Sequence, residues 1–125
     1  MEVGIKGVLT KTVDQKESAK NIGSGLLDVF ATPALVAFVE NTCWMSVSDF
    51  IEEGQTTVGT RMDIKHLKAT PINMKVTCRS ELVKIEGKKL YFEFEASDEK
   101  DLIAKGTHER YIVESKPFQE KTDSK

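Results

Sequence analysis

The sequence predicts an α+β domain in which an antiparallel sheet of about five strands wraps around one long central helix. The first supporting observation is an apolar segment, residues 29–48, in which Glu40 is the only charged residue. The second is a series of strand-like segments after Gly54, in which apolar and polar side chains alternate. The third is that short turns, not helices, connect these strands, which is typical of antiparallel sheets with one covered face.

Length and composition indicate one globular domain spanning residues 1–125, with 39% hydrophobic and 30% charged residues. The net charge of −2 provides no broad basic surface, so we expect no nucleic acid partner. No segment approaches the ~20 apolar residues of a membrane span, and Met1–Lys6 does not begin a signal peptide, so we expect no membrane association. Two cysteines without a disulfide or metal-ligand pattern favour a reducing compartment, and we expect a cytoplasmic protein without a metal.

The first half of the chain is expected to contain a strand, a loop and the helix. Val and Thr residues make Gly7–Val13 the first predicted strand. The polar segment Asp14–Gly25 is interpreted as a loop or lid with a short helical turn. Thr32 and Pro33 then open the helix, because Thr is a favoured N-cap and Pro is favoured at the first helical position. The helix is expected to end near Ile51, and its wide apolar arc is typical of a helix covered by other elements.

Period-two alternation predicts the remaining strands. They span residues 56–66, 74–79, 90–96 and 102–114. Glu86-Gly87 is interpreted as a hairpin turn, and the polar stretch from about Pro117 is predicted to fray. Packing such a sheet around one helix gives the hotdog fold, whose exposed sheet edges favour dimerisation through an edge strand.

Glu40 is the first candidate for a functional residue. At about 100° per residue it falls between Val47 and Ile51 on the helix, so its carboxylate is expected on an apolar face. Removing a carboxylate from water costs several kcal/mol unless a partner compensates it. We therefore expect Glu40 to have a polar partner at a functional site. A structural hydrogen-bond hub and an ion pair at a dimer interface are the alternatives.

Thr32 and His66 are the other two candidates. Thr32 lies about two turns before Glu40 on the same helix, and His66 ends a strand whose inward face also carries Met62 and Ile64. A hydroxyl, a carboxylate and an imidazole are the groups needed to transfer an acyl group or to activate a water. Each residue also has a simpler interpretation, since Thr32 fits a helix N-cap and His66 fits a core or interface histidine.

Five short motifs resemble, in order and spacing, those of the fluoroacetyl-CoA thioesterase-like group of hotdog thioesterases. They are Val29-Phe-Ala-Thr32, Glu40, Val58-Gly59-Thr60, His66-Leu-Lys-Ala-Thr-Pro71 and Gly106-Thr-His-Glu-Arg110. The resemblance covers roughly residues 25–113, and the five motifs together are much more specific than any one of them.

This resemblance implies a catalytic set formed by Thr32, Glu40 and His66. It also implies that Gly59 contacts the acyl thioester and that Arg110 borders the substrate site. The implied protein is a homodimer that hydrolyses a small acyl-coenzyme A thioester, with coenzyme A as part of the substrate and no separate cofactor. Our principal functional hypothesis is therefore an acyl-CoA thioesterase.

Two features depart from the family pattern. Family members selective for the fluorinated substrate carry an aromatic gate before the helix, whereas Asn21–Asp28 contains two glycines and no aromatic residue. This difference argues against fluoroacetyl selectivity, and Pro33 removes one N–H donor at the helix start. Both features favour the alternative of a non-catalytic hotdog module that binds an acyl-CoA or a small acid. A third alternative, hydration of an enoyl thioester, would need an Asp/His pair in a motif that this sequence lacks.

Overall fold

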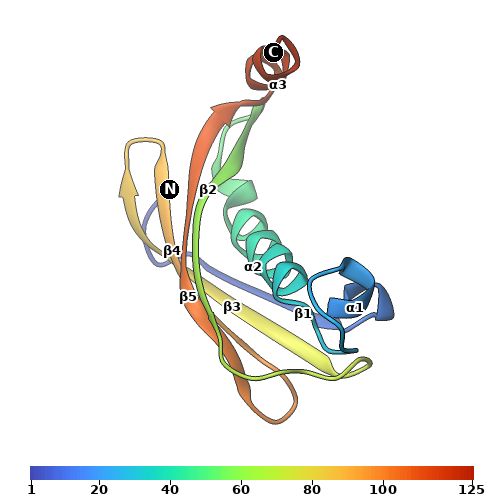
Figure 1. Cartoon of the computed structure of the whole chain (residues 1–125). Helices are drawn as coiled ribbons and strands as arrows, with labels where there is room; N and C mark the ends of the chain where they lie inside the picture. The colour runs from blue at the N-terminus through green and yellow to red at the C-terminus, as the bar shows by residue number, and fades with distance from the viewer.

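The computed structural model describes residues 1–125 as a five-stranded antiparallel sheet wrapped around one long helix, α2 (Figure 1). The strands are β1 (Lys6–Thr12), β2 (Gln55–His66), β3 (Lys75–Glu86), β4 (Lys89–Ser97) and β5 (Leu102–Glu114). The helical elements are η1 (Gln15–Glu17), α1 (Ala19–Ile22), α2 (Thr32–Val47), η2 (Ser48–Phe50) and α3 (Ser115–Asp123). The predicted hotdog arrangement is confirmed. None of the helices combines the length and the apolar character needed to cross a membrane.

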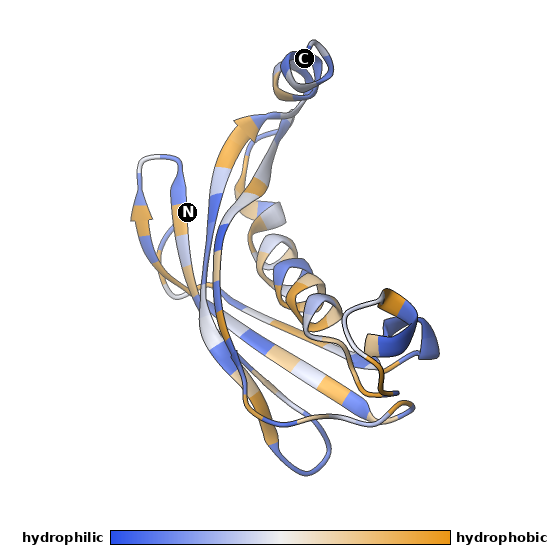
Figure 2. Ribbon diagram, viewed as in Figure 1, coloured by the Kyte–Doolittle hydropathy of each residue, from blue (hydrophilic) through white to orange (hydrophobic).

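The strands pair in the order β1-β3-β4-β5-β2, so β1 and β2 form the two edges of the sheet. One face of the sheet packs against α2, and apolar residues alternate with polar ones along the strands (Figure 2). In β4 the buried residues are Leu90, Phe92, Phe94 and Ala96. On α2 the fully buried apolar residues are Leu35, Val39, Cys43 and Val47. Burial of these two sets against each other forms the core, as the alternation in the sequence predicts.

The start of α2 differs from the prediction. Ala31, not Thr32, is the N-cap residue, and no side chain caps the helix. The hydroxyl of Thr32 is hydrogen-bonded to His66 instead, so it does not turn back to the first backbone N–H groups. α2 ends at Val47, and the turn η2 continues the chain close to the expected end at Ile51.

The C-terminal stretch also differs, because it forms α3 where the sequence predicts fraying. Pro117 lies in the first turn of α3, where its missing N–H breaks no helical hydrogen bond. One turn of the helix is tied by a bond of 3.0 Å from Gln119 Nε2 to Asp123 Oδ1. α3 projects from the end of β5, away from the sheet (Figure 1). It has no apolar face, which explains why its hydrophobic pattern did not reveal it.

Gly106 in β5 lies where the neighbouring strand β2 leaves no room for a side chain. A Cβ at this position would lie 1.9 Å from the backbone oxygen of Asp63 and 2.9 Å from the ring of Phe94. Because the first contact is with backbone, the two strands would have to separate.

We expect Gly106→Ala to lower the free energy of unfolding by about 3 kcal/mol, at the upper end of the usual cost of overpacking. In urea titrations the matched control Gly25→Ala should change it by less than about 0.5 kcal/mol, since its Cβ would lie 3.4 Å from the nearest atom. Equal stability of the two variants would contradict this view of the strand contact.

Candidate active site

The first half of the candidate site is a pair formed by Thr32 and His66. Thr32 opens α2, His66 ends β2, and Thr32 Oγ1 lies 2.7 Å from His66 Nδ1. Thr32 is exposed and His66 is half-buried, and His66 Nε2 is fully covered without a hydrogen-bond partner. The two residues are 34 positions apart in the chain, and only the family resemblance implied that they belong to one site. An exposed hydroxyl bonded to an imidazole nitrogen is the arrangement of a nucleophile and its base.

Burial lowers the pKa of His66 below its usual value near 6.5, and the backbone of Lys68 offsets part of this shift. The ring is therefore neutral at pH 7. A neutral imidazole with Nδ1 facing the Thr32 hydroxyl is able to accept its proton.

The second half of the candidate site surrounds Glu40. It lies eight positions after Thr32 in the helix, which places their Cα atoms about 12 Å apart along the helix axis. The Glu40 side chain is 40% exposed, and its Oε2 lies 3.5 Å from Arg110 Nη1 and 3.9 Å from His108 Nε2. The expectation of a carboxylate enclosed by apolar side chains is therefore wrong. The polar partner that we expected exists, and it is Arg110.

Arg110 is nearly buried, with only 6% of the residue exposed. Its Nε donates to Thr57 Oγ1 at 2.8 Å and its Nη2 donates to the Thr57 carbonyl at 3.0 Å. Its Nη1 donates to His108 Nε2 at 3.0 Å. Burial lowers the pKa of Arg110, while the charge of Glu40 opposes this shift. A guanidinium stays charged in proteins, so Arg110 is a fixed cation directly behind the Glu40 carboxylate.

His108 also lies in this cluster, although the sequence did not single it out. It lies two positions before Arg110 on β5, so both side chains point to the same face of the sheet. That spacing, inside the Gly106–Arg110 motif, was the signal that would have identified it.

Gly59 makes room for this cluster. It precedes an irregularity in the pairing of β2 with β5, between Gly59 and Arg61. A Cβ on Gly59 would lie 2.5 Å from Glu40 Oε2 and 3.3 Å from Arg110 Nη1. The absence of a side chain therefore lets the carboxylate rest against the backbone of β2.

The two cysteines do not contribute a nucleophile. Cys43 and Cys78 are both free and fully buried. Burial raises the pKa of Cys43 to about 12 and that of Cys78 to about 11. Both thiols are therefore protonated at neutral pH, whereas a thiol must ionise to attack.

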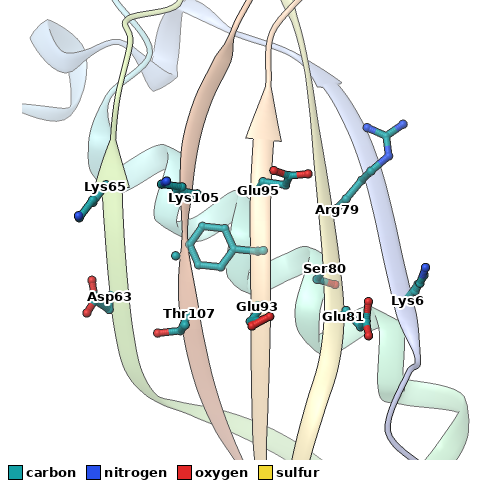
Figure 3. A pocket seen from close by; sticks show the side chains of 12 residues that line it. Lys6, Asp63, Lys65, Arg79, Ser80, Glu81, Glu93, Glu95, Lys105 and Thr107 are labelled. Carbon is teal, nitrogen blue, oxygen red and sulfur yellow. The ribbon is translucent and has the colours of Figure 1, made fainter.

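The opposite face of the sheet carries a separate, open hollow of about 650 Å³. Figure 3 shows its charged lining on the strands, with the long helix behind the sheet. The cationic side chains around it are Lys6, Lys65, Arg79 and Lys105. The acidic ones are Asp63, Glu81, Glu93 and Glu95. None of the five predicted site residues lines this hollow, so it is separate from the candidate site.

The histidines make the stability of the fold dependent on pH. The pKa values of His66 and His108 both lie below 6.5, chiefly because burial disfavours the charged ring. Below about pH 6.5 the unfolded chain therefore binds more protons than the folded protein. We expect the free energy of unfolding to be undiminished above this pH and to decrease as the pH falls toward the lowered values. Urea titrations at about pH 7.5 and 5.5 measure the decrease, which should be smaller in His108→Gln. An equal decrease in that variant would rule out a contribution from His108.

A family model described as fluoroacetyl-CoA-specific thioesterase matches residues 13–116 of the chain. A fluoroacetyl-CoA thioesterase from Streptantibioticus cattleyicolor is 35% identical over 98 residues, which cover 78% of this chain and 70% of that enzyme. A solved structure of a fluoroacetyl-CoA thioesterase is 29% identical, with a TM-score of 0.95, over 100% of this chain and 97% of that chain. A solved structure of a variant of such a thioesterase in complex with acetyl-CoA is 28% identical, with a TM-score of 0.95, and the match covers 99% of this chain and 98% of that chain.

The family match begins just after β1 and continues through β5, so it includes both halves of the candidate site. The resemblance seen in the sequence motifs is thus confirmed by the family model, by the enzyme relative and by the solved structures. The chain belongs to the fluoroacetyl-CoA-specific thioesterase family, which is a family of thioester hydrolases.

Proposed function

We propose that this protein hydrolyses small acyl-CoA thioesters, with Thr32, His66 and Glu40 as its catalytic residues and no separate cofactor. The observation that carries the proposal is the distance of 2.7 Å between Thr32 Oγ1 and His66 Nδ1, at a position where the hydroxyl is exposed. The relatives add support, since one acts on fluoroacetyl-CoA and another was solved with acetyl-CoA.

In the first step His66 Nδ1 accepts the proton of Thr32 as Oγ1 attacks the thioester carbonyl. The carbon–sulfur bond then breaks, and the coenzyme A sulfur takes the proton from His66. This leaves the acyl group as an ester on Thr32. A water next attacks the ester carbonyl and gives one proton to the carboxylate of Glu40. The ester bond between the acyl carbon and Thr32 Oγ1 then breaks, protonated Glu40 returns that proton to Oγ1, and the free acid leaves. Direct attack by water on the thioester is the alternative route, and the short Thr32–His66 bond favours the acyl-enzyme.

The separation between Thr32 and Glu40 supports a site shared between two subunits. β2 is an edge strand of 12 residues, with Gly59 in its first half and His66 at its end. Antiparallel pairing of two β2 edges about a two-fold axis brings the first half of one strand beside the second half of the other. Because the Glu40 carboxylate rests against Gly59, it would then approach the Thr32–His66 pair of the partner. The exposed apolar residues of α2, Trp44 and Met45, are 43% and 45% accessible in one subunit and would find cover in such a dimer.

We propose that Gly59 and Arg110 act through this carboxylate, in addition to bordering the acyl group. Gly59 leaves space for Glu40, and Arg110 balances its charge. The cytoplasm, expected from the two thiols, remains our proposed location.

A panel of coenzyme A thioesters tests the function. Acetyl-, propionyl-, butyryl- and fluoroacetyl-CoA are incubated with the protein, and release of free thiol is followed. We expect thiol release, without a strong preference for fluoroacetyl- over acetyl-CoA, because the segment before α2 presents Leu26 and Leu27 in place of aromatic residues. Thermal stabilisation by the thioesters without any thiol release would instead support the binding module.

A further inference from the structure

His108 is a buried polar residue that the proposed mechanism does not use. Only 1% of it is exposed, and its ring lies against Phe92, with 6.3 Å between the ring centroids. His108 Nδ1 lies 2.7 Å from the carbonyl oxygen of Arg61, and Nε2 lies 3.0 Å from Arg110 Nη1. A carbonyl only accepts and a guanidinium only donates, so Nδ1 carries the proton and Nε2 accepts. The ring is therefore neutral and its orientation is fixed from both sides.

This fixed acceptor determines how Arg110 meets Glu40. Three of the four bonds of Arg110 are short, at 2.8, 3.0 and 3.0 Å, and they go to Thr57 and His108. The fourth, from Nη1 to Glu40 Oε2, is 3.5 Å long. Tight pairs between Arg and a carboxylate have bonds of about 2.7–2.9 Å and are often bidentate. Thr57 and His108 thus keep Arg110 from forming a tight pair with Glu40, and the Glu40 carboxylate stays partly exposed and free to contact a water.

We propose that His108 is a positioning residue for thioester hydrolysis. It holds Arg110 in an orientation that balances the charge of Glu40 without forming a short, bidentate pair with its carboxylate. The inference rests on the proposed catalytic role of Glu40. In the absence of the His108 acceptor, Arg110 Nη1 has no partner on that side and its remaining donors turn to the carboxylate. The Glu40 carboxylate is then held in a tight pair with Arg110, away from the position in which it meets the attacking water. Substrate binding changes little, because His108 is too deeply buried to touch a ligand.

The comparison of His108→Gln with His108→Asn tests the proposal. The Gln carbonyl reaches the place of Nε2 and accepts from Arg110, whereas the shorter Asn side chain restores only the donor to Arg61. We expect His108→Asn to lower kcat at least about tenfold with KM changed less than about threefold, as for an interaction that matters after binding. His108→Gln should recover most of that loss. Equal kcat values for the two variants, or a loss confined to KM, would overturn the proposal.

Two further variants separate this proposal from a general loss of stability and from a failure of the proposed function. Val76→Ala truncates a fully buried core residue on β3 and should lower the melting temperature without lowering kcat. Glu40→Gln tests the role on which the inference depends. Wild-type turnover in Glu40→Gln would overturn the proposed catalytic role of Glu40, on which this inference rests, whereas absence of thiol release from the wild-type protein would overturn the proposed function itself. A large loss in Glu40→Gln together with normal kcat in His108→Asn would overturn only the role of His108.

Discussion

His66→Ala is expected to lower kcat for acyl-CoA hydrolysis by ~10²–10⁴-fold, the usual contribution of a general acid–base group. The variant loses the base that accepts the proton of Thr32 and the acid that protonates the leaving sulfur. His66 is only half-buried and its Nε2 makes no hydrogen bond, so the fold should survive the truncation. Thiol release at saturating substrate measures kcat, and circular dichroism with thermal unfolding confirms the fold.

Two substitutions of Thr32 provide the matched controls. Thr32→Ser retains a hydroxyl and should keep a substantial part of the activity, whereas Thr32→Val has almost the same shape without the hydroxyl. If Thr32 is the nucleophile, Thr32→Val should lose as much kcat as His66→Ala, and the double variant should lose little more, because the two residues act as a unit. Turnover in His66→Ala close to that of the wild type would exclude the proposed base.

The fold could be predicted because its signals are local and periodic. The alternation of Leu90, Phe92, Phe94 and Ala96 assigns one face of β4 to the core, and the buried residues match it. The apolar segment with a single charge likewise identified α2 as the long helix against the sheet, although the covered arc is narrower than expected, since Met45 is 45% exposed. Both patterns repeat over many residues, so a displacement of one residue at an end changes little.

The surroundings of Glu40 could not be predicted in the same way. Helical periodicity gives the face on which Glu40 lies, but not what the sheet presents to that face. Its partner Arg110 lies 70 positions away, and the contact depends on Gly59, whose missing side chain opens the space. The prediction that Thr32 caps the helix was wrong for a related reason, since its hydroxyl is hydrogen-bonded to His66, 34 positions away. Contacts between residues far apart in the sequence can override the local preferences of each residue. Such exceptions are expected at functional sites.

Glu40→Gln should lower kcat by ~10²–10⁴-fold, because the amide keeps the size of the side chain but cannot accept a proton from water. The larger structural question is which Glu40 serves which Thr32. Within one subunit the two residues lie about 12 Å apart along α2, which is too far for one substrate carbonyl to contact both directly. Across a two-fold axis through paired β2 edges they would meet, so the site would be composite.

Mixed dimers decide between the two arrangements. Homodimers of Thr32→Val have no intact site, and homodimers of Glu40→Gln have none. In a composite arrangement a heterodimer of the two variants carries both substitutions in one site and neither in the other. Random mixing makes about half of the dimers heterodimers with one intact site of two, so the mixture should recover about a quarter of the wild-type activity. Co-expression with two affinity tags isolates the heterodimer, in which about half of the activity should return. If all three residues acted within one subunit, every site would carry one substitution and mixing would restore nothing.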